Sequence, residues 1–349
     1  MEKERLIWID LLNIIACASV LLLHCTNSEV HNFSGTPSVD WCIGLTTHSF
    51  FLWPVNVFFM ISGFTLIRNI SLCTINSLEG VKVFYNKRMK RLAVPLLSWN
   101  ILYMILYFVR THINGEDIMP ISELVKKFVL FDYNGFMWFF VPLLMIYLAM
   151  PFIAVFILNS SRNLLRLFLF IGLLMGGIPP IDTTFSAKAD LTDIYLMGSR
   201  FIYFIVAGYY VGHYKLSFRT RKLIYTSSIL CMVVMFIGTA LLTLHNPLHY
   251  KYFIQYTNIP CTLSAIGVFT YFRYYNWNKL TNKLSPDYLA QFSSLSLGIY
   301  LIQGAWFTTL RFFNLCEEHI LLKFIVMYAL CVTSVYVMKK VPLARRLVQ

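Results

Sequence analysis

The stretch LIWIDLLNIIACASVLLLH, residues 6–24, decides the fold class, because it is hydrophobic and long enough to cross a bilayer as a helix. It also contains Asp10, Asn13 and His24. Such side chains are tolerated in a membrane helix mainly where they face other helices or water. At about 100° per residue, Asn13 and His24 project from one face about 16 Å apart along the axis, and Asp10 falls near the same stripe. This stripe is a candidate functional site.

The composition predicts an all-α, polytopic membrane protein. Of its 349 residues, 58% are hydrophobic and 13% are charged, and the mean hydropathy is +0.65. We expect one membrane-embedded domain over residues 1–349, with the first segment retained as a span, since no small-residue cleavage site follows it. Hydrophobic stretches predict about ten transmembrane helices, near residues 6–24, 49–67, 92–109, 136–158, 164–178, 199–214, 223–244, 252–272, 295–313 and 319–338.

The charges between these segments predict the orientation. With the amino terminus inside, cytoplasmic segments hold 21 of the 29 Lys and Arg, while most Asp and Glu fall outside. This positive-inside bias accounts for the net charge of +13 without a nucleic-acid partner. Both termini are predicted to be cytoplasmic.

The first outer loop, Cys25 to His48, has neither Lys nor Arg and would fold over the outer mouth. Cys25 and Cys42 would be able to pair if the outside is oxidising, which the sequence leaves open. The eight cysteines include no C-x-x-C pair, so we expect no metal site. Further along, residues 121–129 have apolar residues on one helical side, which predicts an amphipathic helix on the outer leaflet.

A basic run, residues 84–95, precedes the third predicted span. If it is helical, Arg88 and Arg91 lie at i and i+3 and can grip one polyanion, such as the nucleotide part of an acyl coenzyme A. The simpler reading is that basic residues at a membrane boundary only fix the topology.

Several patterns, in their order along the chain, resemble the acyltransferase 3 family of integral membrane O-acyltransferases. The resemblance covers nearly the whole sequence. Residues that carry it are Arg5, Ile9, Asp10, Leu11, Ala16, Val20, His24, Val57, Phe58, Phe59, Ile61, Ser62, Gly63, Arg88, Arg91, Trp138, Phe139, Phe140, Leu144, Tyr147, Leu148, Pro151, Gly208, Gly212, Leu297, Gly298, Ile299, Tyr300, Leu301 and Ile302.

The resemblance implies a membrane O-acyltransferase, most simply an O-acetyltransferase for polysaccharide modification at the cell (inner) membrane. Acetyl-CoA or another short acyl-CoA would be the donor, held by Arg88 and Arg91. His24 would act as general base or transient acyl carrier toward a hydroxyl of a glycan or lipid-linked saccharide, with Asn13 and Asp10 in support. The chain has Asn13 where many relatives have arginine and Gln303 where many have histidine, so two expected cations are missing.

A transporter or flippase for a saccharide or lipid-linked saccharide is the alternative from a different class, because polar groups inside a ten-helix bundle also suit translocation. We disfavour it because no internal repeat is evident and the arginine pair lies at a helix entrance. The sequence leaves the oligomeric state open, including a homo-oligomer.

Overall fold

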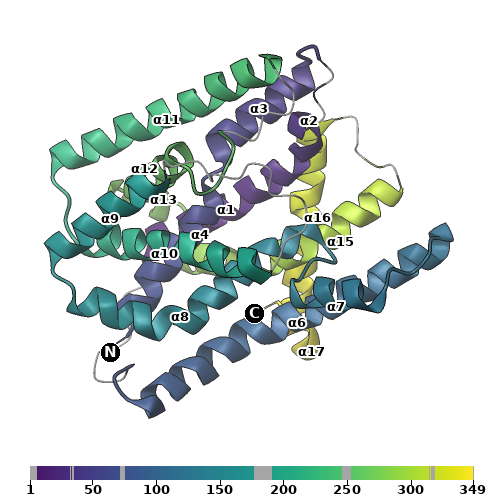
Figure 1. Cartoon of the computed structure of the whole chain (residues 1–349), viewed down its shortest axis with the longest axis horizontal. Coiled ribbons are helices and arrows are strands. Elements are labelled where there is room, and N and C mark those ends of the chain that lie inside the picture. Colours follow the sequence, from purple (N-terminus) through teal and green to yellow (C-terminus); the bar gives the residue numbers. More distant parts are fainter. Residues whose placement is uncertain are drawn as a thin grey trace.

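The computed structural model describes residues 6–31, 33, 35–70, 75–176, 191–245, 253–313, 315 and 319–348. Within these ranges the secondary structure is entirely helical, as predicted (Figure 1). The helices are α1 (Ile7–Cys25), α2 (Asn27–His31), α3 (Val39–Phe51), α4 (Pro54–Arg68), α6 (Leu78–Asn114), α7 (Ile121–Val129), η1 (Gly135–Phe139), α8 (Phe140–Asn159), α9 (Arg162–Gly176), α10 (Leu191–His213), α11 (Phe218–His245), α12 (Ile259–Tyr274), α13 (Asn278–Thr281), α14 (Pro286–Ser293), α15 (Ser296–Phe312), α16 (Ile320–Lys340) and α17 (Pro342–Arg345).

Each of the ten predicted hydrophobic segments overlaps a helix, although several boundaries differ. The helices α6 and α10 begin at Leu78 and Leu191, well before the predicted 92 and 199. The helix predicted from 252 begins only at Ile259, because the Asn258 side chain accepts from the Cys261 amide and caps the first turn. The helix predicted from 49 is interrupted between Phe51 and Pro54, where the proline occupies the first turn of α4.

Six segments of the described chain are apolar and long enough to cross a membrane: 7–25, 39–68, 91–114, 135–159, 218–245 and 320–340. The protein is therefore a multi-pass membrane helical bundle. Three of the other predicted spans, α9, α12 and α15, have 15, 16 and 17 residues. They are shorter than the roughly 20 residues that a fully spanning helix needs.

The helix α1 lies inside the bundle and packs against α4, α12, α14, α15 and α16 (Figure 1). Beside it, α4 and α10 cross with their backbones in direct contact. A Cβ atom at Gly63 would collide with the Ile205 backbone, and one at Gly208 would collide with the Met60 backbone. Glycines at 63 and 208 thus permit the close approach of these two helices.

The helix α6 lies at the edge of the bundle, and α7 runs back beside it (Figure 1). With 37 residues, α6 is about 55 Å long, longer than the ~30 Å hydrocarbon layer. Its first turns therefore extend beyond the membrane. The predicted amphipathic helix at 121–129 is α7.

The segment after α1, which was predicted to be an outer loop, folds into α2 and α3, and these helices pack on each other and on α1. Ser38 caps α3 by accepting from the Trp41 amide. Cys25 is buried, Cys42 is exposed, and the two are not joined by a disulfide.

Candidate active site

A cavity of about 330 Å³ joins the basic run to the polar stripe of α1. Both predicted arginines, Arg88 and Arg91, line it together with Asn13. The described lining residues include no Asp or Glu, so the cavity carries positive charge without a lining carboxylate. Such a cavity favours an anionic ligand.

The two arginines are positioned by α6, which is helical through the whole basic run. Ser77 caps the helix by accepting from the Gly80 amide at 3.1 Å. Arg88 and Arg91 are therefore one turn apart on one side of a continuous helix, as the i, i+3 spacing requires. Tyr147 of α8 lines the opposite part of the same cavity.

Asn13 ties α1 to the turn between α14 and α15. Its Nδ2 donates to the carbonyl oxygen of Ser293 at 3.0 Å and to the hydroxyl oxygen of Ser293 at 3.1 Å. One turn further along α1, the Cys17 thiol donates to the Ser296 carbonyl at 3.6 Å. Ser293 and Ser296 also line the cavity, so these contacts fix one wall of it.

His24 lies near the other end of α1, against the short helix η1. The ring centroids of His24 and Phe136 are 4.4 Å apart in an edge-to-face arrangement. The His24 Nε2 atom is buried and makes no hydrogen bond within the described part of the chain. A buried ring nitrogen of this kind is available to a ligand hydroxyl.

The helix η1 separates His24 from the cavity by one turn. Phe136 contacts the His24 ring, whereas Phe139, three residues later, lines the cavity. Three residues of a 3₁₀-helix rise about 6 Å. Phe136 and Phe139 of η1 thus form an aromatic layer that contacts both polar regions.

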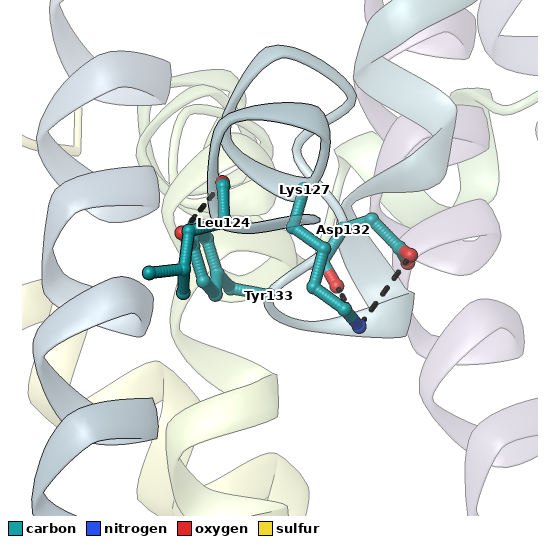
Figure 2. Close-up of polar contacts among 4 residues, drawn as sticks. All are labelled: Leu124, Lys127, Asp132 and Tyr133. Carbon is teal, nitrogen blue, oxygen red and sulfur yellow. Dashed lines mark hydrogen bonds and ion pairs between the residues drawn. The ribbon is translucent and has the colours of Figure 1, made fainter. Parts of the chain in front are cut away.

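The turn after α7 holds η1 in place (Figure 2). Lys127 forms an ion pair with Asp132 at 3.8 Å, and the Tyr133 hydroxyl donates back to the Leu124 carbonyl at 2.8 Å. Phe131 has a φ of 54°, an unusual left-handed conformation for a side-chain-bearing residue. This reversal leads directly into Asn134, whose side chain accepts from the Phe136 amide and caps η1.

The structure thus brings three of the five predicted site residues to one cavity. His24 contacts the adjacent aromatic layer instead. Asp10 is 7% exposed and is not among the described lining residues of this cavity. Gln303, the second departure from the family pattern, is 1% exposed, and its Nε2 makes no hydrogen bond among the described residues. Arg5 lies outside the described residues.

The sequence pattern indicated no binding role for Tyr147 or for the two serines before α15. The structure places Tyr147, Ser293 and Ser294 in the lining of the cavity. The run Ser293-Ser294 is a weak local signal for a site, because consecutive hydroxyls at a helix boundary more commonly serve as caps.

A family model described as an acyltransferase domain matches residues 6–339. Neither curated proteins nor solved structures gave a match.

Proposed function

This chain belongs to the acyltransferase 3 family of membrane proteins, and from that premise we propose that it is a membrane O-acyltransferase. It moves an acyl group, most simply acetyl, from acyl-CoA to a hydroxyl of an extracytoplasmic glycan or lipid-linked saccharide. The observation that supports this proposal most directly is the cavity shared by Asn13, Arg88 and Arg91. It offers a polyanion two guanidinium groups and a path toward α1.

In the proposed reaction the donor approaches from the basic side. Arg88 and Arg91 hold its phosphates, since guanidinium groups match phosphate oxygens in pairs. The acyl-bearing arm then extends along the cavity past Tyr147 toward Phe139. Because positive charge concentrates on this side, it faces the cytoplasm, where acyl-CoA is made.

The transfer step needs only the two substrates and His24. In the direct route, Nε2 takes the proton of the acceptor hydroxyl, whose oxygen attacks the thioester carbonyl. The C–S bond breaks, an ester forms, and the thiolate leaving group takes up the proton. In the carrier route, Nε2 attacks the thioester carbonyl, the C–S bond breaks and the CoA thiolate leaves. The acceptor hydroxyl oxygen then attacks the acyl-imidazole, the C–N bond breaks as the ester forms, and the hydroxyl proton ends on the thiolate. Both routes yield one ester and one free CoA thiol.

Asn13 and Asp10 support this site without touching the reacting atoms. Asn13 holds the Ser293 turn that forms one wall of the cavity, and Asp10 lies buried one turn before it on α1. We place the protein in the cell (inner) membrane as a multi-pass protein, with the acceptor on the outer side near α2 and α3.

The test is turnover by the purified protein in proteoliposomes supplied with acetyl-CoA and a saccharide acceptor. His24→Ala should abolish acceptor-dependent release of CoA, and His112→Ala, an exposed histidine at the end of α6, should retain it. Mass spectrometry of the acceptor should show one added acyl group per CoA released. Movement of unmodified saccharide across the vesicle membrane, at equal rates in both variants and without CoA release, would contradict the proposal and favour a transporter.

A further inference from the structure

A second cavity adjoins the first on its basic side. It has a volume of about 510 Å³ and is lined by Arg91, Ser294, Lys339 and Arg345. Arg91 and Ser294 line both cavities, so the two are neighbours that share a wall. The cations at this junction come from three helices: α6, α16 and α17.

Lys339 is held at this junction by the turn before α15. Its Nζ donates to the Ser294 carbonyl at 2.6 Å and to the Ser294 hydroxyl at 2.8 Å. The preceding residue, Ser293, accepts from Asn13. One pair of serines therefore connects the α1 wall of the first cavity to the lysine of the second.

Arg345 belongs to the segment that ends the described chain, and this segment is anchored to the bundle. The Leu347 carbonyl accepts from the Trp99 indole at 2.9 Å, and Val348 is fully buried. A Cβ atom at Gly298 would contact the Val348 side chain. These contacts fix α17 between α6 and α15, so Arg345 is presented by an anchored segment.

The described residues around the second cavity include three cations and no Asp or Glu. The charges of Arg91 and Arg345 both act on the Lys339 ammonium. Three basic side chains that line one cavity give it a positive potential, which favours an anionic ligand. Topology alone requires basic residues on this side of the membrane, but it does not require three helices to direct them into one cavity.

We propose that Lys339 and Arg345, together with Arg91, form a second phosphate-binding site, which takes a phosphate of the nucleotide part of the acyl donor while Arg88 and Arg91 hold the rest. This inference rests on the proposed acyltransferase function. It assigns the α16–α17 segment to donor recognition.

The experiment measures binding of free coenzyme A to the full-length protein in nanodiscs of phosphatidylcholine. Lys339→Gln and Arg345→Gln should each raise the dissociation constant roughly five- to tenfold, as expected for loss of one charge-assisted contact at a solvent-accessible site. Lys340→Gln is the matched control, because this substitution removes the same charge one residue away. The Lys340 ammonium lies over the Tyr336 ring, 4.5 Å from its centroid. Lys339→Arg should restore most of the affinity.

A second measurement uses the unaltered protein and so does not depend on whether a variant folds. Coenzyme A should protect Lys339 from an amine-reactive reagent, as detected by mass spectrometry, and leave Lys340 equally reactive with and without the ligand. Equal labelling of Lys339 in both conditions would overturn the proposal.

Other outcomes separate the remaining readings. If the wild type binds coenzyme A and transfers acyl groups but both variants bind it equally well, only this inference fails. If the variants instead no longer retain bound phosphatidylglycerol and keep their affinity for coenzyme A, the site binds a lipid headgroup and the nucleotide assignment is wrong. If the wild type binds no coenzyme A, the proposed function fails as well.

Discussion

Asn13 and Ser293 lie 280 residues apart in the chain and are joined by two hydrogen bonds from one side-chain amide. Many relatives are expected to have an arginine at position 13. The asparagine donates hydrogen bonds to Ser293, before α15, without adding a fixed charge to the cavity. Positive charge for an anionic ligand then comes from α6, α16 and α17 alone among the described lining residues.

Asn13→Ala should lower both stability and donor affinity. It removes two partly buried hydrogen bonds, worth about 1–3 kcal/mol together, and frees the Ser293 wall of the cavity. The measurements are the thermal midpoint and the coenzyme A dissociation constant. Asn114→Ala is the control, because the Asn114 side chain donates to the exposed Glu116 carboxylate at 2.8 Å, on the surface and away from the cavity. Equal midpoints for the two variants would show that the Ser293 contact is not structural.

Phe136→Ala should uncouple the reaction. Its ring contacts both His24 and Phe307, so removing it opens the layer between the histidine and the cavity to water. We expect a several-fold rise in CoA release without acceptor, followed with a thiol reagent. Phe152→Ala on α8, a ring that is 76% exposed, should leave this background rate unchanged. A background rate for Phe136→Ala at the wild-type level would mean that the ring does not exclude water.

Gly63→Ala should destabilise the bundle, because the added methyl group meets the Ile205 backbone and backbone cannot rotate away. Overpacking of this kind costs about 1–3 kcal/mol. Unfolding of the purified protein in mixed micelles measures the effect. Gly135→Ala provides the comparison, since a Cβ there meets nothing within 4 Å. A stability for Gly63→Ala equal to that of Gly135→Ala would contradict the close crossing of α4 and α10.

Arg91→Lys should weaken coenzyme A binding although the charge is kept. A lysine supplies a single ammonium group where the guanidinium fork can serve two phosphate oxygens, and Arg91 lines both cavities. We expect a roughly fivefold rise in the dissociation constant, comparable to the loss of one charge-assisted contact. Arg219→Lys, on the exposed start of α11, should have no effect. Wild-type affinity in Arg91→Lys would indicate that only net charge matters.

Much of the fold was predictable from the sequence, because membrane helices must be apolar over a fixed length. Each of the ten hydrophobic segments overlaps a helix, and Arg88 and Arg91 lie on a continuous helix as their spacing suggested. The helix α2 and the first turns of α3 were missed, since they lie in the segment between Cys25 and His48, where the sequence has no apolar run long enough to stand out as a span.

The residues of the candidate site were predictable only where a local sequence pattern marks them. Asn13, Arg88 and Arg91 stand out locally as polar groups beside apolar runs. The roles of Ser293, Lys339 and Arg345 depend on contacts between segments far apart in sequence, and their identities are ordinary for turns and membrane boundaries. No local pattern distinguishes a cation that anchors a helix from one that faces a cavity.

The anchoring of Leu347 and Val348 also has a consequence for biogenesis. Trp99 and Gly298 can receive these residues only after α16 has been synthesised and inserted. The second basic cavity is therefore completed later than the helices that precede α16, and a chain that stops before residue 339 would lack two of its three lining cations.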